Sequence, residues 1–323
     1  MTHTDTSRRS LLALAASAPL VGLFGCQRPP EMVRVASNSW VGYAPLFLAR
    51  ELGHLQEPLL RLVQMPSNSA SLMALASGQI EAAALTLDEL LVARGGGLDL
   101  QVIMVFDESA GADVVMVRPG ITRLEQLRGQ RIAVENTATG ALMLSHTLQA
   151  AGLAPDDVVK VELAGPRQTD AYTRQQVDAV VCFEPHATQL AKLGAQRLID
   201  SSQFPGLILD VLVAQQVAVK AWPQHFTQLV AGCFKALAVL QHTPQLAHQL
   251  LAPTLGITQH ELQQALKGVR METLADNHTL LGGPTPGLLT TAQKVSTMML
   301  SSQLLKAPAP TDRLVNAQFL PPL

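Results

Sequence analysis

Short apolar runs alternate with helical patterns along most of the chain, and the alternation occurs in two series. The first series runs from about Met32 to Phe106, and the second from about Val114 to a strand expected at 207–214. A repeated β-α order is typical of a parallel sheet with helices on both faces. After residue 215 the pattern predicts almost only helix, at 223–242, 244–251, 258–270 and 287–304. The sequence therefore predicts an α/β fold with a helical C-terminal part.

Two such series predict two lobes, each with a parallel-rich sheet flanked by helices. Because the second series interrupts the first, we expect lobe 1 to comprise 33–110 plus 211–323 and lobe 2 to comprise 111–210. The chain would cross between the lobes near 107–114 and 205–214. Ligands of open α/β sheets bind beyond the carboxyl ends of the strands. A cleft between two such sheets would close around a solute by a hinge motion.

The N-terminus has the pattern of an export signal. Arg8 and Arg9 precede an uncharged stretch at 11–25, which is shorter than the roughly 20 apolar residues needed to span a bilayer. Residues 1–25 are therefore predicted to be removed as a signal peptide. The run Ser7–Leu12 is similar to a twin-arginine signal, but paired arginines also occur in ordinary leaders, so the export route stays open.

The run Leu23-Phe24-Gly25-Cys26 ends the uncharged stretch and is typical of a lipoprotein cleavage site. Cys26 is therefore the predicted lipidation site, with an ordinary secretory cleavage as the alternative. Residues 26–32 would act as a tether to a membrane, since more than one lipid chain gives stable anchoring. Without residues 1–25 the formal charge is −3, which excludes the basic surface that a nucleic-acid partner requires.

The other cysteines give no metal or cofactor pattern. Cys182 and Cys233 are expected to be buried free thiols, with a disulfide between them as the alternative. The sequence contains no CxxC, no HExxH and no clustered His/Cys ligand set. We therefore expect neither a metal nor a cofactor.

Candidate ligand-binding residues lie on loops that follow predicted strands. Trp40 and Tyr43 follow the first strand and could form an aromatic platform for a flat or apolar ligand, with core packing as the alternative. Thr137, Thr139 and Gly140 lie at the start of a helix, where amides and hydroxyls suit an anionic or carbonyl oxygen. Capping of the helix by Thr137 or Thr139 is the alternative there.

Other strand ends supply further candidates. These are Thr86, Asp88, Ser109 and Glu184, together with Arg167, which could bind a sulfonate or nitrate or simply be exposed at a helix start. Acidic residues outnumber this arginine on the presumed cleft loops, namely Asp88, Asp107, Glu135 and Glu184. The balance favours a ligand with an amine, an amidine or a ring nitrogen, such as a pyrimidine or the zwitterion taurine.

Four short motifs follow one another in a defined order. They are Trp40–Arg50 with Gly53 (W-x-G-x-x-P-x-x-x-A), Ala74–Ala83 (A-x-x-x-G-x-x-D), Leu124–Val134 (L-x-x-L-x-G-x-x-I-x-V) and Gln176–Pro185 (V-D-A-x-x-x-W-E-P). Together they resemble the periplasmic solute-binding proteins of the nitrate, sulfonate, taurine and pyrimidine import group, the NMT1/THI5-like family. The chain departs from the family patterns at Glu81, where aspartate is usual, and at Phe183, where tryptophan is usual.

The resemblance implies a type II periplasmic-binding-protein fold and a role as the substrate-binding lipoprotein of an ABC importer. Such a protein would capture a sulfonate or taurine, a nitrate-like anion or a pyrimidine in the cleft between its lobes. Its partners would be this solute, a membrane permease and the ATPase subunit of the importer. We expect a periplasmic monomer held to a membrane by its lipid anchor.

Two other functions are compatible with parts of the sequence. Family relatives that make the thiamine pyrimidine are enzymes with a lysine-bound cofactor and a cysteine-rich iron motif. Here the first lysine is Lys160 and no cysteine cluster exists, which disfavours an enzyme. A sensory or adaptor lipoprotein that docks a partner is the other alternative.

Overall fold

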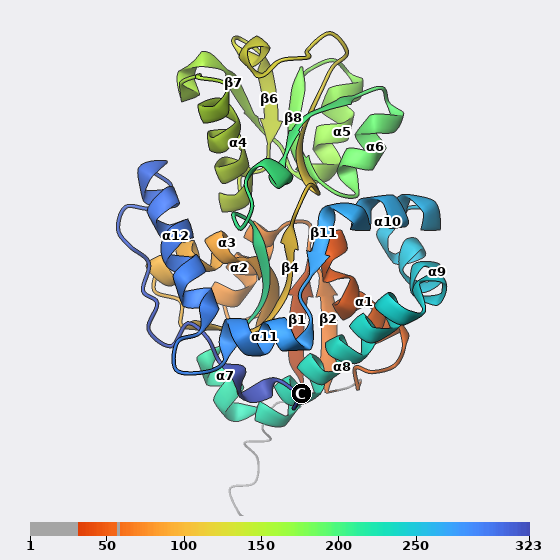
Figure 1. The fold of residues 1–323 in the computed structure, drawn as a ribbon, viewed down its shortest axis with the longest axis vertical. Coiled ribbons are helices and arrows are strands. Elements are labelled where there is room, and N and C mark those ends of the chain that lie inside the picture. Colours follow the sequence, from red (N-terminus) through yellow and green to blue (C-terminus); the bar gives the residue numbers. More distant parts are fainter. Residues whose placement is uncertain (1–31, 57–58) are drawn as a thin grey trace, which may run out of the picture. The chain divides into compact units, whose positions relative to one another are not determined.

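The computed structural model describes residues 32–56 and 59–323 (Figure 1). The predicted signal peptide, Cys26 and the tether up to Glu31 lie outside the described residues. The described part belongs to one structural unit, Met32–Leu323, which contains two β-sheets. Among the described residues, no helix is both long enough and apolar enough to pass through a bilayer.

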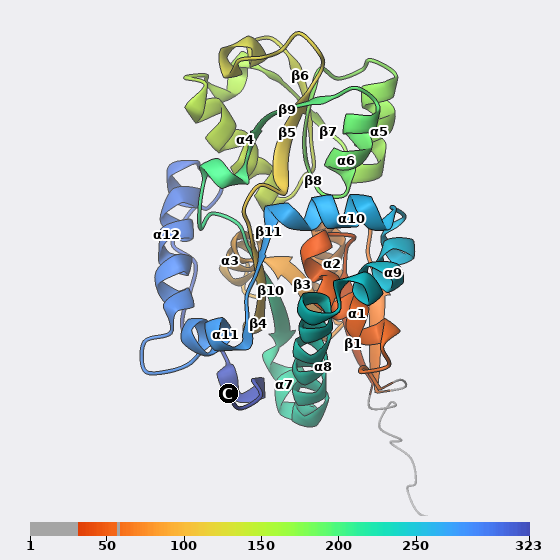
Figure 2. The ribbon, with the colours of Figure 1, turned by 45° about the vertical axis from the view of Figure 1, so that its right-hand side comes forward.

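The first sheet has six strands in the order β11-β4-β10-β3-β1-β2. Their bounds are β1 Val33–Ser37, β2 Leu60–Gln64, β3 Ala82–Thr86, β4 Leu100–Ser109, β10 Leu209–Gln215 and β11 Val269–Met271. Helices pack on both faces, with α1 and α8 on one face and α3 and α12 on the other (Figure 2). The helices of this part are α1 Ala44–Glu51, α2 Asn68–Ala76, α3 Leu87–Gly95, α7 Gln216–Ala221, α8 Pro223–His242, α9 Pro244–Leu255, α10 Gln259–Ala265, α11 Leu274–Leu281 and α12 Gly287–Ser301.

The second sheet has five strands in the order β7-β6-β8-β5-β9. Their bounds are β5 Asp113–Val117, β6 Arg131–Val134, β7 Val159–Glu162, β8 Ala179–Phe183 and β9 Gln196–Asp200. Helix α4 lies on one side of this sheet, and α5 and α6 lie on the other (Figure 1). These helices span α4 Ala138–Ala150, α5 Gly165–Thr173 and α6 His186–Lys192.

Both sheets are mixed, whereas the β-α rhythm predicts largely parallel ones. The parallel pairs are β1 with β2 and β3, and β6 with β7 and β8. The exceptions include the strands that cross between the sheets, because β10 runs antiparallel to β3 and β4, and β5 antiparallel to β8 and β9. A strand that arrives from the other sheet starts at the edge where the parallel strands end, so it runs in the opposite direction.

The helical prediction for the C-terminal part is wrong in one place. The pattern predicts helix over 258–270, but α10 ends at Ala265 and Val269–Met271 forms strand β11. This strand pairs antiparallel with the last residues of β4, Asp107–Ser109, and so covers an edge that would otherwise be open. Helix α11 was not expected, although Thr273 and Asp276 form a capping box at its start.

One ion pair occurs in the same form in each sheet. Arg34 of β1 donates to Glu81, before β3, from Nε at 3.1 Å and Nη2 at 2.6 Å. Arg131 of β6 donates to Asp178, before β8, from Nε at 2.9 Å and Nη2 at 2.8 Å. Each acid also accepts the backbone N–H of its arginine. The acidic positions of two sequence motifs therefore join neighbouring parallel strands.

Candidate ligand-binding site

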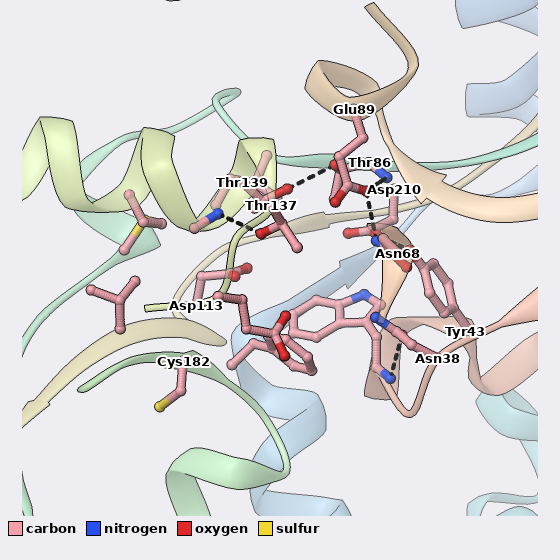
Figure 3. A pocket seen from close by; sticks show the side chains of 17 residues that line it. Asn38, Tyr43, Asn68, Thr86, Glu89, Asp113, Thr137, Thr139, Cys182 and Asp210 are labelled. Atoms are coloured by element: carbon pink, nitrogen blue, oxygen red, sulfur yellow. Dashed lines mark hydrogen bonds between the residues drawn. The ribbon is translucent and has the colours of Figure 1, made fainter. Parts of the chain in front are cut away.

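A pocket lies between the two sheets, at the carboxyl ends of β1, β3, β6 and β8 and the first residues of β5 and β10. Its volume of about 520 Å³, including space open to solvent, suits a small molecule. Seventeen residues line it (Figure 3). They are Asn38, Trp40, Tyr43, Asn68, Thr86, Glu89, Asp113, Glu135, Thr137, Thr139, Gly140, Met143, Val181, Cys182, Phe183, Ile208 and Asp210.

Trp40 forms an aromatic wall of the pocket, and polar contacts fix its position. Its indole Nε1 donates to Asp107 Oδ2 at 3.4 Å, and its backbone N–H donates to Asn38 Oδ1 at 2.9 Å. The ring meets Phe183 edge to face, with 5.8 Å between the ring centroids. Because Phe183 ends β8 of the second sheet, this aromatic surface extends across both sheets.

Gly42 explains the W-x-G part of the first motif. A Cβ atom built on Gly42 would overlap both Trp40 Nε1 and the Asp107 carboxylate. Any side chain at this position would therefore separate the indole from its carboxylate partner. The glycine is needed for the position of Trp40.

Asp107 and Asp210 lie opposite each other on the antiparallel strands β4 and β10, and both are buried. Burial, and for Asp210 also the charge of Asp107, raises the pKa of both carboxyls well above the ordinary value. Tyr43 donates its hydroxyl to Asp210 Oδ1 at 2.6 Å. The polar groups of the two aromatic side chains, Trp40 and Tyr43, are thus both used to hold carboxylates of the first sheet.

Glu89, at the start of α3, is a further buried carboxyl of the pocket. Its Oε2 accepts Asn68 Nδ2 at 2.7 Å and the backbone N–H of Thr86 at 3.2 Å. Burial, together with the charge of Asp88, raises the pKa of Glu89 to about 8. Asn68 is itself buried, and its Oδ1 has no hydrogen-bond partner within the protein.

Hydroxyl groups connect the two sides of the pocket. Thr86 Oγ1, at the end of β3, lies 2.8 Å from Thr139 Oγ1 in α4, and Thr139 Oγ1 also donates to Asp88 Oδ2 at 3.1 Å. Burial raises the pKa of Asp88 to about 6. Thr137 caps α4 by accepting the N–H of Gly140 at 3.0 Å, as the capping alternative predicts.

The second sheet adds two carboxyls. Asp113 begins β5, and burial raises its pKa to about 7, with a further contribution from the charges of Asp88 and Glu135. Glu135 Oε1 accepts the N–H of Gly165 at 2.6 Å, and burial raises its pKa as well. Within the described part of the chain, all four titratable carboxyls of the lining are buried, and no Lys, Arg or His lines the pocket.

Six of the ten residues predicted to bind ligand line this pocket. They are Trp40, Tyr43, Thr86, Thr137, Thr139 and Gly140. Asp88 lies directly behind the lining as the partner of Thr139. The loops after β1, β3 and β6 therefore converge on one place, as expected for the carboxyl ends of parallel strands.

Ser109, Arg167 and Glu184 lie outside the lining. Ser109 Oγ is 2.8 Å from Ser201 Oγ. This contact links the two places where the chain leaves one sheet for the other. Glu184 accepts the N–H of Thr188 at 3.0 Å and forms an ion pair with Arg197 at 3.3 Å. Arg167 is exposed in the first turn of α5, which is the alternative placement given for it above.

The residues predicted to bind ligand do not include several polar residues of the lining, namely Asn38, Asn68, Glu89, Asp113 and Asp210. The sequence could have indicated Asp210, because it is the one charged residue in the apolar run predicted as a strand at 207–214. The apolar lining residues Met143, Val181 and Ile208 cannot be told from core residues by sequence.

Cys182 lines the pocket, and Cys233 lies in the core of the first sheet; both are buried free thiols, as expected. Burial, with the charges of Glu184 and Asp113, raises the pKa of Cys182 well above the ordinary value. The thiol is therefore held in its protonated, weakly nucleophilic form.

The NMT1/THI5-like family model matches residues 40–247. The chain is 26% identical to the taurine-binding periplasmic protein of Escherichia coli over 242 residues, which cover 70% of this chain and 74% of that protein. Its structure is similar to the alkanesulfonate-binding protein SsuA from Xanthomonas axonopodis pv. citri bound to MOPS, with a TM-score of 0.73, 19% identity and coverage of 88% and 96% of the two chains.

The desulfurization enzyme DszB is also similar, with a TM-score of 0.66, 17% identity and coverage of 90% and 97%. At such identities the structural similarity concerns the fold. The predicted α/β fold of periplasmic binding proteins is confirmed.

Proposed function

The chain belongs to the NMT1/THI5-like family, and from this premise we propose that it is the solute-binding protein of an ABC importer. It would capture a small organic solute between its two sheets and present the closed form to a membrane permease and its ATPase subunit. The observation that carries this proposal is a small-molecule pocket whose walls come from both sheets.

The proposed mechanism is closure of the two sides of the pocket around the solute. Thr86 and Thr139 meet at 2.8 Å from opposite sides, and Ser69 Oγ donates to the carbonyl of Asn136 at 2.8 Å beside them. In an open form these contacts would separate and a solute could enter. The free-energy difference between the two forms, altered by the solute, would signal occupancy to the permease.

The proposed moving parts are lobe 1, 33–110 plus 211–323, and lobe 2, 111–210. Between the lobes the chain crosses at Ala110–Ala112 and again after Ser201. Gly111 has a φ of +124°, a conformation that favours glycine, and its N–H donates to Ser201 Oγ at 2.7 Å. Rotation at these two neighbouring crossings would open the pocket without disturbing either sheet.

The proposed location is the periplasm, where the E. coli relative is found. We include in this proposal cleavage before Cys26, lipidation of its thiol and attachment to a membrane as a monomer, with either Sec or twin-arginine export. The solute would then be captured close to the permease.

Binding without chemical conversion is favoured over catalysis at this site. Cys182 is the thiol of the lining, and its raised pKa makes it a poor nucleophile. No covalent step is needed for capture and delivery.

Thermal unfolding of purified protein with sulfonates, amino-sulfonates, nitrate, bicarbonate and pyrimidines tests the proposal. A bound solute at 100 times its dissociation constant should stabilise the protein by about 2.7 kcal/mol. Small-angle scattering on the same samples should show a smaller radius of gyration when the active compound is present. A solute that stabilises the protein while leaving its scattering curve unchanged would contradict the closure mechanism.

A further inference from the structure

We propose that the pocket recognises a small organic cation with N–H groups, such as an amidinium, a guanidinium or a protonated amine, attached to a flat or apolar body. The inference rests on the proposed solute-binding function and specifies its substrate class. This class differs from the anionic sulfonates that the structurally similar proteins bind. It follows from the charge of the lining, its unpaired hydrogen-bond acceptors and its aromatic surface.

The charge of the pocket lining favours a cationic ligand. The four carboxyl groups of the lining have little exposure: 1% for Glu89, 2% for Asp210, 6% for Asp113 and 8% for Glu135. A sulfonate in this space would lose its hydration and gain no neighbouring cation in the described part of the lining. A bound cation instead compensates carboxylates that burial otherwise disfavours.

Basic residues near the pocket are already paired elsewhere. Arg270 is the cation whose charge reaches Asp107, but its guanidinium forms ion pairs with Glu108 and Glu272. The N-terminus of α4 would suit an anion, yet Thr137 Oγ1 already accepts its Gly140 N–H. Arg270 is therefore not free to pair with a bound anion, and the start of α4 has one N–H fewer to offer.

Unpaired acceptors are the second argument. Asp210 Oδ2 and Asn68 Oδ1 are buried, belong to the lining and have no hydrogen-bond partner within the protein. Asp107 Oδ1 and Asp88 Oδ1, just behind the lining, are also buried without a hydrogen-bond partner. Buried acceptors normally have a donor, so the matching ligand supplies several N–H groups. A quaternary ammonium, which has no N–H, does not meet this requirement.

The N–H and O–H donors of the two aromatic side chains are already used by other acceptors. Trp40 Nε1 is committed to Asp107, and the Tyr43 hydroxyl is committed to Asp210 Oδ1. Figure 3 shows Asp210, Asn68 and Tyr43 together on one side of the pocket, and Trp40 belongs to the same lining. The aromatic rings are thus left to contribute apolar surface, which suits a flat ligand body beside the cationic group.

Ligands of equal shape and different charge provide the test. Benzamidinium, benzamide and benzenesulfonate form one series, and butylammonium and butanesulfonate form another, with taurine as the zwitterion. Isothermal titration calorimetry and thermal unfolding at pH 8 should show binding of the cations, with at least about tenfold weaker binding of the neutral and anionic counterparts.

Two variants assign this selectivity to the pocket carboxyls. Asp210→Asn and Glu89→Gln keep the shape of each side chain and should weaken cation binding about tenfold or more. The empty Asp210→Asn protein should also melt at a higher temperature than the parent, since the repulsion with Asp107 is removed; a carboxylate with only a structural role would make it melt lower. Asp170→Asn, on the exposed surface of α5, is the matched control and should change neither property.

The outcomes separate this inference from the proposed function. If benzenesulfonate, butanesulfonate or another anion binds more tightly than its cationic counterpart, solute binding stands and the cation inference is overturned. The same holds if Asp210→Asn and Glu89→Gln leave cation affinity unchanged. If no compound of either charge binds or stabilises the protein, both proposals fail.

Discussion

Thr86 and Thr139 place their hydroxyl oxygens 2.8 Å apart, although they belong to different sides of the pocket. Thr139→Val removes this contact and the hydrogen bond to Asp88 while keeping the shape of the side chain. We expect solute affinity to fall about three- to tenfold, because one or two hydrogen bonds of the closed form are lost. Calorimetry on the best solute measures this. Thr147→Val, buried in the same helix away from the pocket, is the control, and an equal loss there would contradict the role of the bridge.

Gly42→Ala tests how the first motif positions the indole. The added Cβ would overlap Trp40 Nε1 and the Asp107 carboxylate, so the indole must move. We expect solute affinity to fall by an amount close to that of Trp40→Ala, on the order of tenfold. Fluorescence quenching of Trp40 should change too. Arg167→Ala, outside the lining, should bind like the parent protein. Normal affinity in Trp40→Ala with an intact fold would rule out the aromatic wall.

Glu81→Gln and Asp178→Asn should destabilise the protein without changing its solute affinity. Each substitution breaks a two-point contact with an arginine on a neighbouring strand. For Glu81→Gln we expect a loss of about 1 kcal/mol in the free energy of unfolding, a modest value because Arg34 is partly exposed. Urea unfolding measures this loss of stability. Calorimetry on the folded variants, without urea, measures the solute affinity. A large loss of affinity in either variant would mean that these acids act on the pocket.

The empty protein should become less stable as the pH rises from about 5 to 9. Burial raises the folded-state pKa of Asp88 to about 6, of Asp113 to about 7 and of Glu89 to about 8. Between the ordinary pKa near 4 and these values, the folded protein binds more protons than the unfolded chain, so stability falls with increasing pH. Urea unfolding at several pH values should show a loss of at least ~2 kcal/mol across this window. Stability that rises over the same window would contradict the buried carboxyl cluster.

The alternation of strands and helices was sufficient to predict the fold class and most elements. Helix α8 was predicted with its observed bounds, Pro223–His242. Strand β11 was missed because Val269–Met271 is too short to show a period of two and gains its pairing only from the distant edge of β4. The antiparallel course of β5 and β10 was also missed, since direction follows from how the chain crosses between sheets.

The site was predictable where loops follow parallel strands, as for Trp40 and Thr139. It was not predictable where a carboxyl begins a crossing strand, as for Asp113 and Asp210, because their place at the pocket depends on the antiparallel pairing. Arg167 and Glu184 also follow strands in the chain, but they lie outside this lining. Arg167 is exposed, and Glu184 forms an ion pair with Arg197.

Strand β11 has a consequence for observing the proposed motion. The segment before it lies against the first crossing, where Ala110 donates its N–H to the carbonyl of Gly268 at 2.8 Å, and a Cβ on Gly268 would come within 2.7 Å of Ala112 N. Ala110 is the last residue of lobe 1 before the crossing, so rotation there would strain its hydrogen bond with Gly268. The rate of deuterium exchange at the Ala110 amide therefore reports on opening. We expect this rate to fall when a solute keeps the two halves together.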